Sequence, residues 1–208
     1  MKNRLRAEMK ERLAEMPPRQ RNDKSIAACK LLVSLPEFRR AASMMVYLPM
    51  PQEIDCSEAA LEAWREGKSV LAPRVDWKGR HLVPVEMRSL EDGIVTGRHG
   101  LREPAEGPAW PVGRIDLVIV PALAFDVTGA RLGRGGGFYD RFLRQDGLRA
   151  VACGMAFREQ VVDRLPAEGH DRTVDILVTD QQVVRFDPRP LPAGAPETYI
   201  KDGNGGKK

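Results

Sequence analysis

The residues best suited to chemistry are concentrated in a glycine-rich stretch at positions 129–143. Four glycines fall within five positions here, which lets the backbone adopt conformations closed to residues with a Cβ and approach a ligand closely. Arg131 and Arg134 can donate paired hydrogen bonds to phosphate or carboxylate oxygens. Asp140 supplies a carboxylate beside the expected phosphate position, where a magnesium ligand is needed. The stretch therefore predicts a phosphate-binding loop, whose glycines are Gly133, Gly135, Gly136 and Gly137.

Two common nucleotide-binding motifs do not fit this stretch. No Gly-Lys-Ser/Thr follows at Walker-loop spacing, and reading Gly-x-Gly-x-x-Gly from Gly133 places Phe138 where the third glycine belongs. The Gly-Lys-Ser at 67–69 has Glu62 where a P-loop has its first glycine, so it indicates a helix end instead. The alternative interpretation is a solvated surface loop with Asp140 near a helix start, where aspartate is common. Arginines interleaved with aromatic residues favour the ligand-binding loop.

Composition fits one globular domain that binds small anionic molecules. The 208 residues are 42% hydrophobic and 30% charged, with a net charge of +4 and a pI near 9.1. The arginines are scattered, which argues against nucleic acid as a partner. The three cysteines are far apart and form no Cys-x-x-Cys pair, so neither a disulfide framework nor a zinc site is expected. A charged N-terminus without an apolar run predicts no signal peptide and no membrane span, and we expect a cytoplasmic protein.

Strand and helix patterns alternate along the chain. Apolar, β-branched runs predict strands at 43–48, 70–75, 115–120, 150–154 and 174–178. Helical patterns cover 2–16, about 22–33, about 56–66 and 158–165, and a further helix is expected to open inside the glycine cluster. This alternation predicts a single three-layer α/β/α domain with a mainly parallel, Rossmann-like sheet over residues 1–186. Residues 187–208 are expected to be a disordered tail.

Several further patterns indicate local structure or allow no assignment of a function. Asp55 and Glu58 are spaced as a capping box for the helix through about residue 66. Residues 76–113 contain many glycines and prolines, and beyond a hairpin-like turn and a strand from His81 they allow no assignment of roles. His81 and His99 show no metal spacing, and Asp171 beside His170 lacks the serine motif that a catalytic triad needs.

The run from Arg131 to Arg141, Arg-Leu-Gly-Arg-Gly-Gly-Gly-Phe-Tyr-Asp-Arg, closely resembles the signature loop of the 5-formyltetrahydrofolate cyclo-ligases, also called methenyltetrahydrofolate synthetases. The likeness extends from residue 2 to about residue 186. Phe138 departs from it, because many relatives have a second tyrosine there, and we expect reduced affinity at most since ring packing remains. The resemblance implies ATP- and Mg²⁺-dependent conversion of 5-formyltetrahydrofolate to 5,10-methenyltetrahydrofolate through a phosphorylated formyl group, with release of ADP and phosphate.

The resemblance also implies roles for individual residues. It makes Tyr139 and Arg134 catalytic and assigns Mg²⁺ to Asp140 and Asp171. The nucleotide would contact an N-terminal basic segment and the loop, which are Lys2, Asn3, Arg4, Leu5, Arg6, Arg131, Leu132, Gly133, Arg134, Gly135, Gly136, Gly137, Phe138 and Tyr139. The folate would contact a proline-stiffened turn and the same loop, which are Leu48, Glu53, Arg134, Gly135, Gly136, Gly137 and Phe138.

Other functions remain as alternatives at this point. A paralogue without folate turnover, or an α/β enzyme acting on a phosphosugar, would share the fold and the loop. A nucleic-acid-binding regulator would need a clustered basic face, which the sequence lacks. We expect a monomer, with a dimer as the alternative.

Overall fold

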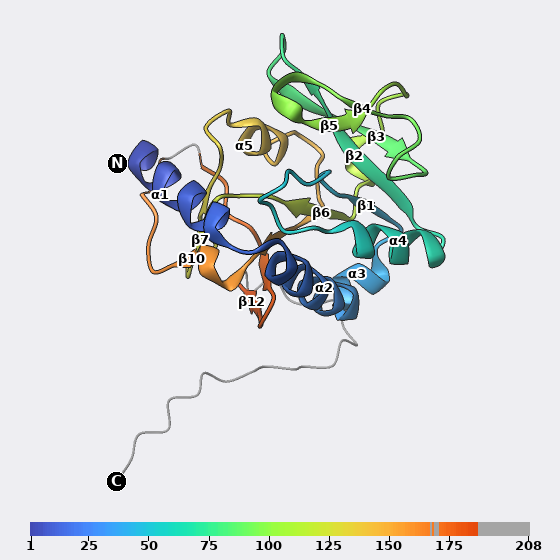
Figure 1. Ribbon diagram of the computed structural model, residues 1–208. Coiled ribbons are helices and arrows are strands. Elements are labelled where there is room, and N and C mark those ends of the chain that lie inside the picture. The colour runs from blue at the N-terminus through green and yellow to red at the C-terminus, as the bar shows by residue number, and fades with distance from the viewer. Residues whose placement is uncertain (167, 169–170, 187–208) are drawn as a thin grey trace.

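The computed structural model describes residues 1–166, 168 and 171–186, which surround one large sheet (Figure 1). The strand order is β12-β11-β9-β6-β1-β2-β3. The five inner strands are parallel, whereas β3 and β12 pair antiparallel at the two edges, so the expected α/β fold with a mainly parallel sheet is confirmed. The strands are β1 (Ser43–Met45), β2 (Ser69–Asp76), β3 (His81–Met87), β6 (Leu117–Val120), β9 (Val151–Ala156), β11 (Ile176–Thr179) and β12 (Val183–Arg185).

Helices cover both faces of the sheet, because successive strand residues point to opposite sides. Met44 packs in one hydrophobic cluster with Leu32 and Phe38, whereas Met45 packs in the other with Phe142. The first face carries α2, α3 and α4, and the second carries the short α5 together with non-helical segments (Figure 1). The helices are α1 (Lys2–Glu15), α2 (Pro18–Ser34), α3 (Pro36–Arg40), α4 (Ser57–Arg65) and α5 (Phe138–Phe142).

Two helix starts differ from the sequence prediction. Helix α2 begins at Pro18 rather than at 22–23, because proline is well accommodated in the first helical turn, where its missing N–H is not needed. Helix α4 begins at Ser57 without a side-chain cap on Cys56, so the predicted capping box is wrong. The Asp55 carboxylate instead accepts a hydrogen bond of 2.8 Å from the N–H of Ser57.

A small three-stranded sheet separates β6 from the glycine cluster. It has the order β10-β7-β8 and consists of β7 (Ala124–Asp126), β8 (Arg131–Leu132) and β10 (Val161–Val162). The glycine cluster therefore follows β8 and not β6, the strand predicted at 115–120. The Asp126 carboxylate explains the insertion, because it accepts the N–H groups of Thr128 and Ala130 and closes the β7–β8 turn.

The second half of the chain holds two further corrections. The predicted helix at 158–165 is a single 3₁₀ turn, η3 (Arg158–Gln160), followed by β10. The Gln160 side chain explains the break, since it accepts the N–H of Phe157 and donates to the carbonyl of Ala122 rather than facing solvent on a helix. The sheet also continues past the last predicted strand into β12.

The segment that allowed no assignment forms a projecting layer beside the sheet (Figure 1). The predicted hairpin turn is confirmed at residues 77–80, between β2 and β3. A second pair, β4 (Ile94–Thr96) and β5 (Arg102–Pro104), encloses the 3₁₀ turn η1 (Arg98–Gly100), and β5 packs against β2. Another 3₁₀ turn, η2 (Val112–Arg114), leads into β6.

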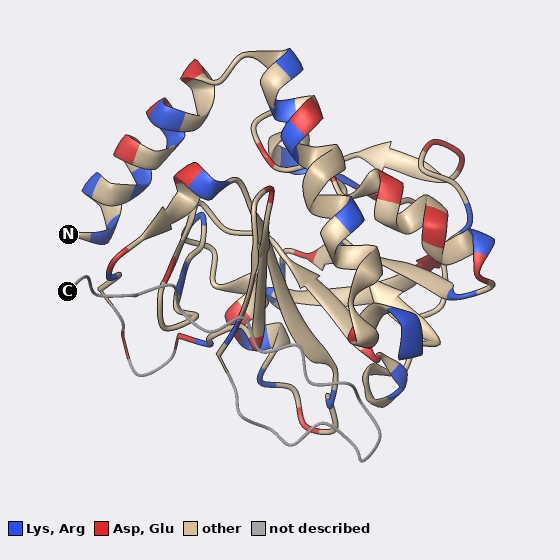
Figure 2. Ribbon diagram, turned by 90° about the horizontal axis from the view of Figure 1, so that it is seen from below, with Lys and Arg blue, Asp and Glu red and all other residues tan. Residues whose placement is uncertain are grey.

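Basic and acidic residues are interspersed over the helices and loops (Figure 2). In the part of the chain that the structure describes, no helix is both long and apolar enough to cross a membrane. The predicted disordered tail at 187–208, and His170 of the rejected dyad, lie outside the described residues.

Candidate active site

Two cavities meet at the glycine-rich loop, defined from here as residues 133–137. The apolar cavity has a volume of about 480 Å³, and its wall includes Tyr47, Leu48, Glu53, Trp77, Phe138 and Tyr139. The polar cavity has a volume of about 510 Å³, and its wall includes Lys2, Asn3, Arg6, Gly135 and Asp171. Both cavities are lined by Arg131, Gly133, Gly137 and Asp140. The loop therefore forms part of the wall of both the apolar and the polar cavity.

The backbone of the glycine-rich loop presents unsatisfied donors. Gly135 and Gly137 have φ angles of +106° and +66°, conformations that favour glycine. Within the described residues, no acceptor contacts the N–H groups of residues 134–137. Helix α5 has only five residues and adds little dipole, so the loop amides rather than a helix N-terminus would bind an anion.

Helix α1 brings cations to the polar cavity. Arg6 donates through Nε to the carbonyl of Gly133 at 3.0 Å and through Nη1 to Asn3 Oδ1 at 2.6 Å. Lys2 Nζ lies 2.8 Å from Asp171 Oδ2 and 3.1 Å from Glu168 Oε1. Burial lowers the pKa of Lys2, but the hydrogen bonds to these two carboxylates outweigh that effect and raise it. The first turns of α1 thus contact the loop, although the two segments are more than a hundred residues apart in the sequence.

Three carboxylates line the polar cavity, those of Asp140, Glu168 and Asp171. Asp140 Oδ1 accepts a hydrogen bond of 2.7 Å from Arg131 Nη2 and one of 3.1 Å from the N–H of Arg172. Asp171 Oδ2 accepts from Lys2 and from the N–H of Glu168. No group of three or more His, Cys, Asp or Glu side chains that could enclose a metal occurs among the described residues. A cation at these carboxylates would need further oxygens from a ligand.

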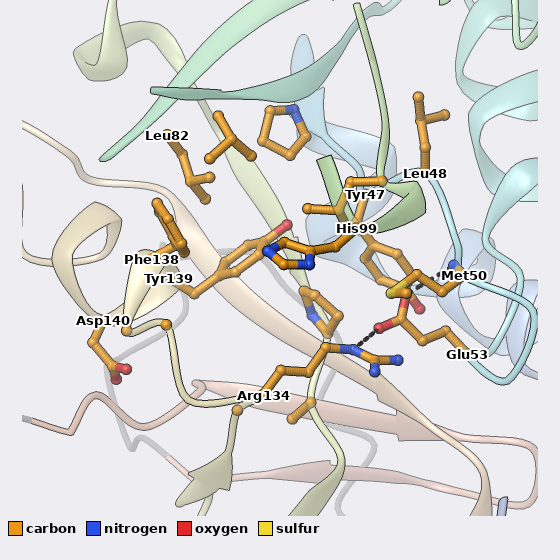
Figure 3. A pocket seen from close by; sticks show the side chains of 18 of the residues that line it. Tyr47, Leu48, Met50, Glu53, Leu82, His99, Arg134, Phe138, Tyr139 and Asp140 are labelled. Carbon is orange, nitrogen blue, oxygen red and sulfur yellow. Dashed lines mark hydrogen bonds and ion pairs between the residues drawn. The ribbon is translucent and has the colours of Figure 1, made fainter. Parts of the chain in front are cut away.

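An ion pair crosses the apolar cavity (Figure 3). Arg134 Nε donates to Glu53 Oε1 at 2.9 Å, and Glu53 Oε2 accepts the N–H of Met50 at 3.0 Å. The pair joins the glycine-rich loop to the turn at 49–53, so that both ends of the cavity wall carry a polar group. The rest of the wall is mainly aromatic and aliphatic, which suits a flat heterocycle with a few hydrogen-bonding edges.

Comparison with known proteins agrees with this geometry. The sequence profile of the 5-formyltetrahydrofolate cyclo-ligase family matches residues 1–180. The chain belongs to this family. The prediction of a ligase made from the loop is therefore confirmed at the level of the family.

Individual relatives cover most of the chain. The 5-formyltetrahydrofolate cyclo-ligase of Mus musculus is 28% identical over 82% of this chain and 89% of its own length. That of Mycolicibacterium smegmatis is 37% identical over 67% and 74%. The NMR structure of the 5,10-methenyltetrahydrofolate synthetase of Aquifex aeolicus superposes with a TM-score of 0.79 at 31% identity, covering 93% of this chain and 97% of that one.

In this cyclo-ligase family member, Arg131 lines both cavities and Tyr139 lines the apolar one. The Tyr139 hydroxyl is buried without a hydrogen-bond partner among the described residues, and burial raises the pKa of Tyr139 well above its ordinary value. The Arg131 side chain is 3% exposed and its Nε likewise lacks a partner there. Burial lowers the pKa of Arg131, and the neighbouring Asp140 carboxylate opposes that shift. Unpartnered buried donors at a cavity wall are suited to a ligand with acceptor oxygens.

Most of the family-implied residues converge on the two cavities, and two do not. Arg4 is 88% exposed and pairs with Glu8 one turn further along α1, while Leu5 packs against the hydrophobic core. Helix periodicity explains this, because residues 2, 3 and 6 share one face of α1 and residues 4 and 5 point elsewhere. Phe138 keeps the ring packing expected of it, with its centroid 5.4 Å from that of Trp77.

Some residues in the wall of the apolar cavity were not predicted from the sequence. Trp77, His99 and Leu101 line the cavity, and the rings of Trp77 and His99 pack edge to face at 5.5 Å. His99, which shows no metal spacing in the sequence, adopts a left-handed φ of +61° in η1 and points into the cavity (Figure 3). The Gly-Leu-Arg-Glu-Pro run at 100–104, which also resembles the cyclo-ligase family, borders the apolar cavity through Leu101 and Arg102.

Proposed function

We propose that this chain converts 5-formyltetrahydrofolate to 5,10-methenyltetrahydrofolate with hydrolysis of ATP to ADP and phosphate, in the presence of Mg²⁺. One observation carries the proposal. An apolar cavity and a polar, cation-lined cavity share the wall formed by Arg131, Gly133, Gly137 and Asp140. A reaction that joins a heterocyclic substrate to a phosphate donor needs both sites within reach of one another.

The polar cavity would receive the phosphates of ATP. The N–H groups of the glycine-rich loop would bind oxygens of the triphosphate, and Lys2, Arg6 and Arg131 would neutralise its charge. Asp140 and Asp171 would hold Mg²⁺. Both arginine and backbone donors approach Asp140 at Oδ1, so in the described structure Oδ2 has no protein donor and suits a hard cation that takes its other ligands from phosphate and water. The ion supplies charge neutralisation at the transferring phosphate.

The apolar cavity would receive the pterin ring. Leu48, Trp77 and Phe138 offer apolar and aromatic surface, and the Glu53 carboxylate can accept hydrogen bonds from ring and amino N–H groups. Binding there would place the N5-formyl group toward the glycine-rich loop. Arg134, which donates a hydrogen bond to Glu53, would then be available to the developing phosphate.

The chemistry needs little covalent participation by the protein. The formyl oxygen attacks the γ-phosphorus, an O–P bond forms, and the bond to the β-phosphate oxygen breaks as ADP leaves. N10 then attacks the activated formyl carbon, the C–O bond breaks, and the proton lost from N10 balances the hydrogen of the HPO₄²⁻ released. Tyr139, kept neutral by burial, can donate its hydroxyl proton in a hydrogen bond to these oxygens, while Arg131 and Arg134 stabilise their negative charge.

The three cysteines are free and buried, which agrees with a reducing cytoplasm as the place of action. We propose a single domain that acts as a monomer on small-molecule substrates.

The deciding experiment mixes purified protein with 5-formyltetrahydrofolate and MgATP and follows the near-ultraviolet absorbance of the methenyl product. Growth of that band should require ATP, Mg²⁺ and folate together. If no band grows while a non-hydrolysable ATP analogue still binds, the folate assignment is wrong and other phosphate acceptors, including phosphosugars, become the candidates. If neither activity nor nucleotide binding is detected, the polar cavity is not an ATP site.

A further inference from the structure

Arg141 holds the glycine-rich loop from outside both cavities. Its Nη2 donates to the carbonyl of Gly136 at 2.7 Å, and its Nε donates to the carbonyl of Arg80 at 2.5 Å. The guanidinium also lies 5.2 Å from the centre of the Phe138 ring. Among the described residues that line the apolar and polar cavities, Arg141 does not occur. Its charge therefore serves the loop rather than a ligand directly.

The contact with Gly136 fixes the direction of a neighbouring donor. Every described peptide bond is trans, so the C=O of Gly136 and the N–H of Gly137 point in opposite directions across one rigid plane. Because Arg141 holds the carbonyl on one side, the Gly137 N–H must face the other side. Gly137 lines both cavities, and its N–H has no acceptor in the described structure.

The approach of Arg141 also accounts for glycine at position 137. A Cβ built on Gly137 would lie 3.0 Å from Arg141 Nη1, and the φ of +66° is itself unfavourable for other residues. The guanidinium is thus packed against the loop backbone and does not merely pass near it.

The second carbonyl belongs to the β2–β3 turn. Arg80 has a left-handed φ of +54°, which is uncommon outside glycine, and the Asp76 carboxylate accepts the N–H groups of Lys78 and Gly79 in the same turn. This conformation presents the Arg80 carbonyl to Arg141. The turn also carries Trp77, whose ring packs on Phe138, so one guanidinium links the turn that walls the apolar cavity to the loop that walls both.

We propose that Arg141 is a positioning residue for the phosphate-binding loop: its forked guanidinium, fixed between the carbonyls of Gly136 and Arg80, keeps the loop amides directed at the polar cavity before ATP binds. This inference rests on the proposed function, since it takes ATP as the ligand of that cavity. It assigns to the guanidinium a geometric role that a single ammonium cannot perform, because lysine cannot donate along two fixed directions of one plane.

The test is calorimetric titration of the full chain with a non-hydrolysable ATP analogue and Mg²⁺, using the wild type, Arg141→Ala, Arg141→Lys and Arg149→Ala. Arg149 is an exposed arginine that precedes β9, and its variant makes the same change in net charge. We expect dissociation constants about tenfold higher for both Arg141 variants and within about twofold of wild type for Arg149→Ala, because only the first two lose the pre-ordered loop. In turnover assays, the KM for ATP should rise more than the KM for the folate.

The outcomes separate this inference from the proposed function. Wild-type affinity in Arg141→Ala, or its recovery in Arg141→Lys, would overturn the positioning role, the latter because charge alone would then suffice. Equal rises in both KM values with a lowered melting temperature would also overturn it, in favour of general destabilisation. If the wild type itself does not bind the analogue, the proposed function fails first. Should Arg141→Ala not fold, Arg141→Lys decides alone.

Discussion

The polar and apolar cavities share a wall but are assembled in different ways. The polar cavity is made of charged side chains already paired with one another, such as Lys2 with Asp171 and Arg131 with Asp140, around loop amides that have no acceptor among the described residues. The apolar cavity is made of rings and aliphatic side chains from the turn at 49–53, the β2–β3 hairpin and η1, with one ion pair across it. A ligand in the first must exchange partners with existing ion pairs, whereas a ligand in the second mainly displaces water.

This difference separates the energetic demands on the two sites. In the polar cavity, the charged side chains already have partners. A ligand therefore gains binding free energy only if its contacts with them are better placed than the existing ion pairs, which requires a loop that is ordered before the ligand binds. In the apolar cavity, burial of ring surface supplies most of the gain and tolerates small displacements. Substitutions in the loop should therefore act strongly on ATP, and substitutions in the apolar wall should act more moderately on the folate.

The largest effect is expected from Gly136→Val, which tests whether the loop is a phosphate site at all. A Cβ at this position would lie 2.7 Å from the Phe138 ring, so either the loop or that ring must shift. We expect affinity for the ATP analogue to fall by about a hundredfold or more, roughly 2.7 kcal/mol, without loss of the fold. Gly113→Val, the same change at an exposed glycine of η2, is the matched control. Tight binding by Gly136→Val, measured by calorimetry, would remove the loop from the phosphate site.

Asp140→Asn asks whether a metal connects the two cavities. Asparagine keeps an oxygen for Arg131 but removes the negative charge that a divalent cation needs. Turnover should fall at least about tenfold, which corresponds to about 1.4 kcal/mol of barrier, and the Mg²⁺ dependence should shift to higher concentration. Asp146→Asn, at an exposed position just after α5, should be silent. Near-normal kinetics with an unchanged Mg²⁺ titration would exclude Asp140 as a metal ligand.

Glu53→Gln tests the independence of the apolar cavity. Glutamine keeps the shape of the side chain but loses the charge that holds Arg134 and that would bind pterin N–H groups. We expect the KM for 5-formyltetrahydrofolate to rise about tenfold, the loss of one charge-assisted hydrogen bond of about 1.5 kcal/mol, with little change in ATP affinity. The exposed Glu58 provides the control, Glu58→Gln. A larger effect on ATP than on folate would mean that the two cavities do not bind the two substrates separately.

Tyr139→Phe should have the smallest effect on the turnover rate. Its effect on the melting temperature should show whether the buried hydroxyl has a structural partner. The variant removes a buried hydroxyl that has no partner among the described residues, so the folded state should gain stability, with a rise of about 2–4 °C in melting temperature for each kcal/mol gained. Turnover should fall about threefold, if one hydrogen bond to the transferring oxygens is lost at a net cost below 1 kcal/mol. A melting temperature that falls, observed by calorimetry, would indicate that the hydroxyl already has a structural partner.

Local patterns were sufficient for much of the fold and for the glycine-rich loop, whereas Lys2, Arg6 and Asp171 of the polar cavity entered through family resemblance. The parallel strands could be predicted because they are short, apolar and β-branched, and α1 because its apolar residues recur at helical spacing up to Pro17. The loop could be predicted because glycines, arginines and an aspartate lie within ten residues of each other. Errors arose where a buried side chain bonds to a distant part of the backbone, as Asp126 does with the N–H of Leu165 and Gln160 with the carbonyl of Ala122.

The apolar cavity could be predicted only in part. Glu53 entered through family resemblance, while Trp77 and His99 carried no local signal, because an aromatic ring or a histidine in a turn has the same sequence appearance whether it faces solvent or a pocket. The sequence by itself determined the chemistry of the site, since the donors, cations and carboxylates of the loop are adjacent along the chain. Only the tertiary structure decided which other segments contact the loop. Helix α1 places Arg6 against the carbonyl of Gly133, and the β2–β3 turn places the carbonyl of Arg80 against Arg141. The wall of the apolar cavity comes from segments that are far apart in the sequence and come together only when the chain folds.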